Sequence, residues 1–231
     1  MTRKMFWEDM YLADFEAMVV SAVGSRVVLD RTAFNPRGGG LVSDSGTING
    51  AAVREATKEG DEVIHEMQEA STLKAGQAVR GVLDWERRYR IMRMHTAAHI
   101  LSSIVNGETG ALITGNQIRP DESRVDFNLE QFDRERMTFF IDRVNEAAGR
   151  NLEVSAYFMK REEVLATPGL VKLANAMPPT LETLRIVRIG DVDSQADGGV
   201  HVRNTGEIGR VVGLRTENKG KSNRRLYFKV E

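Results

Sequence analysis

The chain of 231 residues contains no cysteine. It therefore has no disulfide framework, and any metal site must be built from histidine, aspartate or glutamate side chains. The sequence also lacks an apolar run close to the roughly 20 residues that span a bilayer. Its first nine residues include four charged side chains and do not form an apolar signal segment. These absences lead us to expect a cytoplasmic protein that has no membrane contact.

A large excess of charge of either sign is absent as well. Lysine and arginine total 32 and aspartate and glutamate 33, so the formal net charge is −1. Overall charge therefore does not favour nonspecific binding to nucleic acid, and any such contact must come from local patches. The length suits two modest domains or one large one.

Only four histidines are present, and three of them fall into two pairs of ligand-type residues with one spacing. His95 and His99 form the first pair, and Asp197 and His201 form the second. A helix places residues i and i+4 on one face, and an ion such as Zn²⁺ takes imidazole and carboxylate ligands in sets of three or four. One such pair is often a chance occurrence, but the two together predict a metal site. His65 lies in the charged stretch Glu62-Val63-Ile64-His65-Glu66, and we expect it on the surface.

Three consecutive glycines, Gly38, Gly39 and Gly40, follow the segment Phe34-Asn35-Pro36-Arg37. Such a run costs chain entropy and usually serves a turn or a close approach of the backbone to a ligand. It is not a phosphate-binding loop of the Gly-Lys-Ser/Thr type, because that sequence does not follow it. A flexible hairpin tip and a loop laid over a neighbouring site both remain open interpretations.

Two clusters of basic residues stand out against the balanced charge. A cluster of this kind is more often a solvated face, and contact with phosphates is the alternative. The first cluster lies beside the first histidine pair and consists of Arg87, Arg88, Arg90 and Arg93. The second lies at a predicted hairpin and consists of Lys219, Lys221, Arg224 and Arg225.

The first 90 or so residues have the pattern of short strands separated by turns. Alternating or β-branched segments at 16–23, 25–30, 62–67 and 78–84 are punctuated by glycine-containing turns. Strands with turn signals at this spacing are typical of a small antiparallel barrel, with 78–84 as its closing strand.

The pattern changes after residue 84, where helical periodicity begins. A helix over about 84–105 has an apolar stripe of Ile91, Met94, Ala98, Leu101 and Ile104. A second helix over about 129–148 ends at Gly149 and has a core face of Met137, Phe140, Ile141 and Val144. Strands at 154–158 and 184–189 and a hairpin over 209–230 complete an α+β fold. We therefore expect a small antiparallel β-barrel domain over residues 1–88 and an α/β domain over residues 89–231.

Several segments together resemble the editing domain of alanyl-tRNA synthetase and its free-standing relatives, the AlaX proteins. These segments are 34–46, 88–101, 114–117, 124–127 and 197–209, with the basic stretch 219–225. The resemblance implies an N-terminal barrel followed by a zinc-bearing editing domain that hydrolyses the ester of mischarged tRNA(Ala). Possession of both the barrel and the glycine-rich loop is similar to the medium-length AlaX type. That type is associated with the removal of seryl and glycyl groups, so we expect a trans-editing hydrolase for Ser-tRNA(Ala) and Gly-tRNA(Ala).

The resemblance also implies roles for particular residues. One Zn²⁺ per chain would be held by His95, His99 and His201. Asp197 stands where the family commonly has cysteine, and it would either ligate the ion or orient the attacking water.

The remaining roles concern the substrate. The substrate pocket would be formed by Gly38, Gly39, Gly40, Thr114, Gly115, Asn116 and Gln117. The tRNA-binding residues would be Lys219, Lys221, Arg224 and Arg225. The residues leave two other functions open, namely a metal-dependent hydrolase of another ester or amide and a catalytically silent tRNA-binding module.

Overall fold

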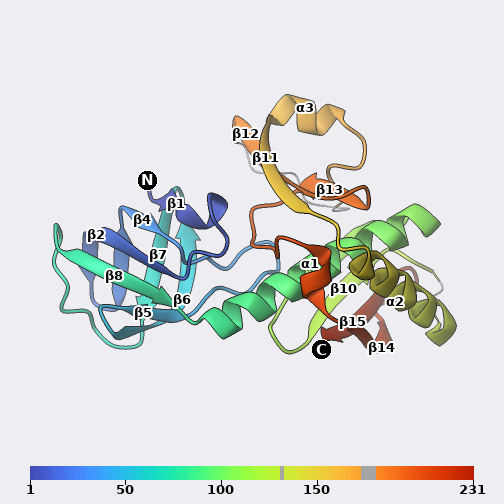
Figure 1. Cartoon of the computed structure of the whole chain (residues 1–231), viewed down its shortest axis with the longest axis horizontal. Helices are drawn as coiled ribbons and strands as arrows, with labels where there is room; N and C mark the ends of the chain where they lie inside the picture. Colours follow the sequence, from blue (N-terminus) through green and yellow to red (C-terminus); the bar gives the residue numbers. More distant parts are fainter. Residues whose placement is uncertain (131–132, 173–180) are drawn as a thin grey trace. The chain divides into compact units, whose positions relative to one another are not determined.

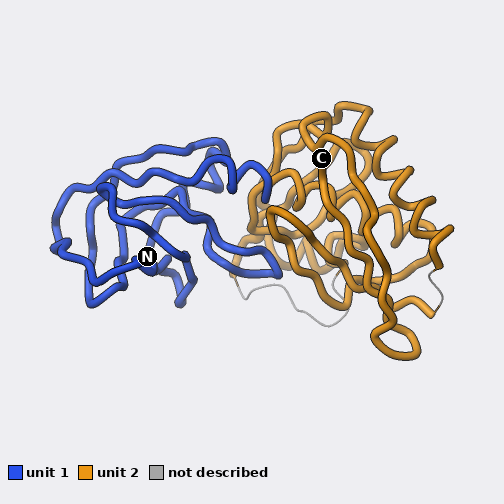
Figure 2. The backbone as a smooth tube through the Cα atoms, turned by 90° about the horizontal axis from the view of Figure 1, so that it is seen from below, with its two compact units in different colours: residues 1–91 blue, residues 92–231 orange. Residues whose placement is uncertain are grey.

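The computed structural model describes residues 1–130, 133–172 and 181–231, and these form two compact units (Figures 1 and 2). Unit 1 comprises Met1–Ile91 and unit 2 comprises Met92–Glu231. The long helix α1, Trp85–Thr109, begins in unit 1 and ends in unit 2. Both sheets and helices are present, so the α+β class is confirmed. Among the described residues, no helix has the length and apolar character needed to cross a bilayer.

Unit 1 is built on six antiparallel strands that close on themselves in the order β2-β3-β7-β6-β5-β8. Their bounds are β2 Asp14–Val23, β3 Arg26–Leu29, β5 Gly46–Ile48, β6 Ala51–Glu59, β7 Glu62–Met67 and β8 Ala78–Leu83. Strands β2 and β8 alternate between exposed and buried positions, as the walls of a filled barrel must. The short strands β1 (Arg3–Lys4) and β4 (Arg31–Thr32) pair in parallel, with the 3₁₀ turn η1 at Met5–Trp7.

The barrel interior is apolar and closely packed. Phe15 and Phe34 pack edge to face within it, with ring centroids 6.0 Å apart. A Cβ atom at Gly81 would lie 2.4 Å from the ring of Phe15, so only glycine fits at this point of β8.

His65 also lies inside the barrel, so the prediction of a surface position is wrong. Its side chain is fully buried on β7, with Nδ1 3.0 Å from the carbonyl oxygen of Val27 and Nε2 2.8 Å from Thr32 Oγ1. Burial lowers the pKa of His65 to about 4, so the ring is neutral at physiological pH. The ring packs edge-on against Phe34, and its two hydrogen bonds offset the cost of burying its nitrogens.

Arg88 is not part of a solvated basic face either. Its guanidinium is completely buried and forms two hydrogen bonds to the Asp44 carboxylate, at 2.9 and 2.5 Å. It also donates to the carbonyl oxygens of Met10 and Ala33. Asp44 in turn accepts the backbone N–H of Asn35 at 2.6 Å. Asp44 and Asn35 flank the segment that carries the three glycines, so these hydrogen bonds hold its two ends together.

The described residues of unit 2 form two separate sheets. The first has the order β14-β15-β10-β9 and the second the order β11-β12-β13. The strands are β9 Ile113–Gln117, β10 Ser123–Phe127, β11 Val154–Lys160, β12 Thr183–Ile189, β13 Asp193–Ala196, β14 Val211–Asn218 and β15 Arg224–Val230. The remaining elements are α2 Arg134–Gly149, α3 Arg161–Ala166 and the 3₁₀ turn η2 at Thr205–Ile208.

The two long helices have different surroundings. Positions 94–102 of α1 are buried without a break, so the predicted apolar stripe describes only one side of a helix that is covered on all sides. Helix α2 packs its predicted core face on β14, where a Cβ atom at Gly213 would lie 3.0 Å from Ile141.

Helix α2 begins later than the predicted start near residue 129. It starts at Arg134 because the side chain of Asp133 accepts the backbone N–H of Arg136 at 2.8 Å and caps the first turn. Residues 131 and 132, which the prediction included, lie outside the described residues.

Candidate metal centre

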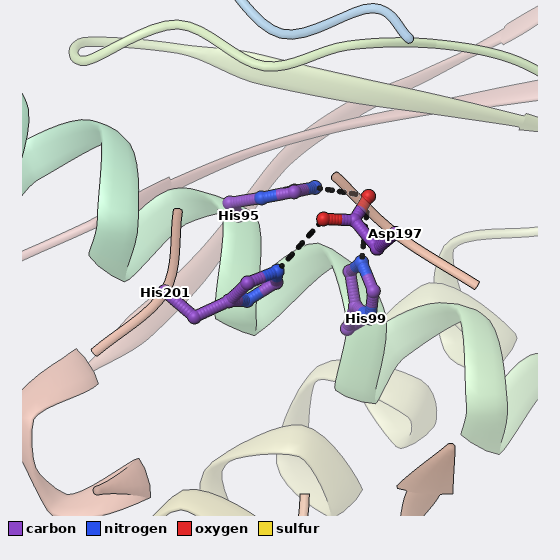
Figure 3. Close-up of side chains that lie close together, drawn as sticks. All are labelled: His95, His99, Asp197 and His201. Carbon is purple, nitrogen blue, oxygen red and sulfur yellow. Dashed lines mark hydrogen bonds and ion pairs between the residues drawn. The ribbon is translucent and has the colours of Figure 1, made fainter. Parts of the chain in front are cut away.

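Four side chains from two distant parts of unit 2 converge on one point (Figure 3). Helix α1 supplies His95 and His99, and the segment after β13 supplies Asp197 and His201. Their ligand atoms all lie within 4.8 Å of one another. The three histidines are buried, whereas the Asp197 side chain is 22% exposed. Asp197 therefore marks the side from which solvent reaches the cluster.

The local backbone explains how each pair is formed. His95 and His99 are one helical turn apart on the same face of α1. In the second pair, Asp197 Oδ1 accepts the backbone N–H of Gly199 at 2.6 Å, which folds the chain back toward His201. Arg185, buried on β12, donates Nη1 to the carbonyl oxygens of Asp197 and Gly199 at 3.2 and 2.9 Å and fixes this turn.

All three imidazoles present the same ring nitrogen to the Asp197 carboxylate. Nε2 of His201 lies 3.2 Å from Asp197 Oδ1. Nε2 of His95 and Nε2 of His99 lie 3.6 and 3.8 Å from Asp197 Oδ2. Four donor atoms therefore surround a position that is suited to a single cation.

The opposite ring nitrogen of each histidine has its own partner. His95 Nδ1 lies 3.2 Å from the carbonyl oxygen of Val200, and His99 Nδ1 lies 2.9 Å from Asp193 Oδ2 and 2.7 Å from Gln195 Nε2. His201 Nδ1 lies 3.1 Å from Thr96 Oγ1.

The hydrogen of the Thr96 hydroxyl is directed elsewhere. That hydroxyl donates to the carbonyl oxygen of Met92 at 2.9 Å, so it accepts from His201 Nδ1. With these partners at Nδ1, Nε2 is the nitrogen of each ring that would bind a metal, which is the usual arrangement around ligating histidines.

The pKa values in the absence of a metal ion separate the three imidazoles. Burial lowers the pKa of His95 to about 4 and that of His201 well below its usual value. Burial also opposes a charge on His99, but hydrogen bonds to Asp193 and Asp197 raise its pKa to about 9. For Asp197, burial alone would favour the neutral acid, yet the surrounding histidines hold its pKa well below the ordinary value. At neutral pH the metal-free cluster thus contains one imidazolium beside the Asp197 carboxylate.

Three supporting residues were not predicted from the sequence. Asp193 lies four residues before Asp197, the same spacing as the predicted pairs, so this signal was available. Thr96 and Arg185 carry no comparable signal, since their partners are 105 and 14 residues away in the chain.

The predicted pocket residues lie in both units. Gly38, Gly39 and Gly40 belong to unit 1, where Gly39 and Gly40 have φ angles of 58° and 87°. They form a tight turn, because Gly38 and Leu41 exchange two backbone hydrogen bonds. This turn matches the hairpin-tip interpretation, and its proximity to a substrate stays a prediction.

The other predicted pocket residues, Thr114, Gly115, Asn116 and Gln117, lie on β9 and are half-buried. Thr114 Oγ1 donates to Asn223 Oδ1 at 2.9 Å. A Cβ atom at Gly115 would lie 3.1 Å from Asp126 Oδ2, so Gly115 lets this carboxylate pack against β9.

The C-terminal basic cluster divides into two kinds of residue. Arg225 forms two hydrogen bonds to the Asp126 carboxylate, at 2.7 and 2.8 Å, and Arg224 donates to backbone carbonyl oxygens that include that of Gly220. Lys219 and Lys221 are exposed at the tip of the β14–β15 hairpin, where Lys219 pairs with Glu217 at 2.9 Å. The lysines are therefore better placed than the arginines to contact a partner.

Comparison with known proteins gives results for both units. Residues 184–227 match the family described as the threonyl and alanyl tRNA synthetase second additional domain. The chain is 42% identical to the alanyl-tRNA editing protein AlaX-M of Saccharolobus solfataricus over the full length of both. It is 42% identical to the AlaX-M protein of Methanosarcina mazei, covering 100% of this chain and 97% of that protein. It is 34% identical to an alanine–tRNA ligase of Methanococcus maripaludis, covering 94% of this chain and 24% of the ligase.

Proposed function

The chain belongs to the AlaX-M family of alanyl-tRNA editing proteins, and from this premise we propose that it hydrolyses the ester bond of mischarged tRNA(Ala) at a zinc centre formed by His95, His99, His201 and Asp197. The proposed substrates are Ser-tRNA(Ala) and Gly-tRNA(Ala). The observation that carries the proposal is the convergence of three Nε2 atoms and one carboxylate in unit 2.

The donor set and its spacing suit zinc. Ligand atoms about 2.0–2.2 Å from a tetrahedral zinc ion lie roughly 3.3–3.6 Å from one another. Asp197 Oδ1 lies 3.2 Å from His201 Nε2, and Asp197 Oδ2 lies 3.6 and 3.8 Å from Nε2 of His95 and His99, close to that range. The four ligand atoms as a set lie within 4.8 Å of one another, so they would draw together around a bound ion. Imidazole and carboxylate are both common zinc ligands, and no thiolate is available in this chain.

When bound, zinc would supply Lewis acidity, which polarises an ester carbonyl and allows a water molecule to ionise near pH 7. The three imidazoles hold the ion, and their Nδ1 partners keep each ring in a fixed orientation. We assign Asp197 as the fourth ligand and not as a general base. The position supports ligation, because the family commonly has cysteine there and the carboxylate oxygens lie 3.2–3.8 Å from the three Nε2 atoms. With four protein ligands, the ion would have to accept water or the ester carbonyl as a fifth ligand, which catalytic zinc can do. That group would approach from the exposed Asp197 side.

The exposed lysines at the hairpin tip would supply a contact for the tRNA backbone. Lys219 and Lys221 would bind phosphates and would add affinity without reading the sequence.

Discrimination against the correct alanyl group needs more than pocket size, because the alanine side chain is intermediate in size between those of glycine and serine. A buried polar group matched to the serine hydroxyl would disfavour alanine by about 1–3 kcal/mol.

A deacylation assay with Ser-, Gly- and Ala-tRNA(Ala), run beside zinc analysis, tests the proposal. We expect about one zinc per chain and rapid loss of the seryl group, with the alanyl group retained. His99→Ala should lose zinc and activity. His65→Gln, a matched change at a buried histidine outside the cluster, should keep its zinc.

Three results would contradict the proposal. Absence of hydrolysis of all three substrates would indicate a silent tRNA-binding module. Equal activity on free amino-acid esters would indicate a hydrolase of another substrate class. Unchanged zinc content in His99→Ala would remove the metal assignment.

A further inference from the structure

A buried chain of polar side chains lies on the Nδ1 side of His99. Asp193, at the start of β13, has a fully buried carboxylate. Its Oδ2 lies 2.9 Å from His99 Nδ1, a nitrogen that the side-chain amide of Gln195 also contacts at 2.7 Å, and its Oδ1 accepts from the ammonium group of Lys172. Lys172 also donates to Ser103 Oγ at 3.1 Å, and Ser103 donates to the carbonyl oxygen of Val192 at 2.6 Å. Since Ser103 follows His99 by one helical turn, the cluster holds one face of α1 against β13.

We propose that Asp193 and Lys172 are positioning residues of the metal centre, which act through His99 by holding its ring with Nε2 directed at the ion. This inference rests on the metal site of the proposed function. A carboxylate that accepts from the far nitrogen of a ligating histidine fixes the tautomer and makes the imidazole a stronger donor.

The energetics favour a functional role over a purely structural one. A buried ion pair is expensive, because two charges leave water, and apolar residues of similar volume often stabilise a fold as well or better. Here the two oxygens of Asp193 have different tasks, since one binds the histidine and the other binds the ammonium group. The ammonium group of Lys172 therefore neutralises the buried charge of Asp193, and the contact with His99 determines where that carboxylate lies.

His99 differs from the other two histidines in this respect. His95 Nδ1 faces a backbone carbonyl and His201 Nδ1 a hydroxyl, whereas His99 Nδ1 faces the Asp193 carboxylate together with the amide of Gln195. The carbonyl of Lys172 also accepts the N–H of Ile113, the first residue of β9, at 3.0 Å. Lys172 thus connects the orientation of a metal ligand to the strand that carries Thr114, part of the predicted pocket.

Two variants and two matched controls test the inference. Asp193→Asn removes the charge and keeps the size, and Lys172→Met removes the ammonium group and keeps the stem. Asp191→Asn alters an exposed carboxylate two residues away that pairs with Arg150 at 2.8 Å, and Lys160→Met alters an exposed lysine on β11. The zinc Kd is measured by competition with a chromophoric chelator above pH 9, where His99 no longer holds a competing proton. The visible spectrum is recorded after loading with Co²⁺, and the Tm is measured without metal.

We expect Asp193→Asn to weaken zinc binding by about 10–100-fold and to shift the Co²⁺ absorption bands. Lys172→Met should change the zinc Kd and the Co²⁺ bands in the same direction but to a smaller extent, and the two controls should match the wild type. Asp193→Glu, which restores the charge, should bind zinc more tightly than Asp193→Asn. Should Asp193→Asn fail to fold, Lys172→Met decides the question.

A lower Tm with an unchanged zinc Kd and an unchanged Co²⁺ spectrum would overturn the inference, because the cluster would then serve only the fold. The two proposals can be separated. A wild type without stoichiometric zinc contradicts the proposed function. A zinc-binding, active wild type with unaltered variants contradicts only the positioning role.

Discussion

Zinc binding at pH 6 should release one proton per ion, and not the two or three expected for ordinary histidines. The reason lies in the unequal pKa values of the metal-free cluster. His95, with a pKa of about 4, and His201, with a pKa far below its usual value, are already neutral at pH 6. His99, with a pKa of about 9, is protonated and must lose its proton before Nε2 can bind the ion.

The same pKa values determine how the apparent zinc affinity depends on pH. Because the pKa of His99 is raised, protons compete with the metal below pH 9, and affinity rises with pH until that point. One competing proton gives a tenfold change per pH unit, so the apparent zinc affinity should rise about 100-fold between pH 6 and pH 8.

Calorimetric titration with zinc at pH 6, in buffers of different ionisation enthalpy, counts the released protons. At this pH a zinc-associated water with a pKa near 7 contributes little to the count. A value near one supports the assigned charge state of His99. A value near zero or near two, or a zinc affinity that stays flat from pH 6 to pH 8, would refute it.

Three further predictions concern other parts of the chain. Asp197→Asn should weaken zinc binding or activity at least tenfold, because the ligand charge is lost, and Asp197→Cys should retain zinc. Wild-type zinc affinity and rates in Asp197→Asn would mean that the side chain only shapes the turn. Replacing Lys219 and Lys221 with alanine should raise the KM for charged tRNA and reduce the dependence of that KM on salt concentration, with zinc content unchanged. If the salt dependence stayed as in the wild type, the hairpin would be only a solvated surface. Asp44→Ala should destabilise unit 1 by about 3–5 kcal/mol in urea unfolding, because it leaves a buried guanidinium uncompensated. Asp14→Ala, at an exposed pair, is its control, and equal effects of the two changes would contradict the argument.

Local patterns were sufficient for the elements that have strong periodicity. The stripe on α1 and the core face of α2 predicted both helices, and the alternation in 78–84 predicted β8. Strand β6 was not predicted as a separate strand, since Ala51–Glu59 is rich in alanine and charged residues, which do not favour strands by themselves. Its place between β5 and β7 is set by pairing within the barrel.

The candidate site was predictable where its residues are spaced regularly and not where partners meet only in three dimensions. The two i, i+4 pairs identified all four members of the cluster. The roles of Lys172 and Thr96 depend on contacts across 21 and 105 residues of chain. Burial misled the prediction for His65 and Arg88, because a polar side chain in a barrel wall or at a helix start carries no local sign that its partners lie inside.

The composition of the metal cluster has a consequence for redox chemistry. Its donor atoms are imidazole nitrogens and carboxylate oxygens, and the chain has no thiol at this site or elsewhere. A thiolate ligand can be oxidised by peroxide to sulfenic and then sulfinic acid, which ends metal binding. The nitrogen and oxygen ligands of this centre have no such route. We therefore expect a metal bound at the proposed centre to be retained through exposure to peroxide that would strip a cysteine-ligated centre.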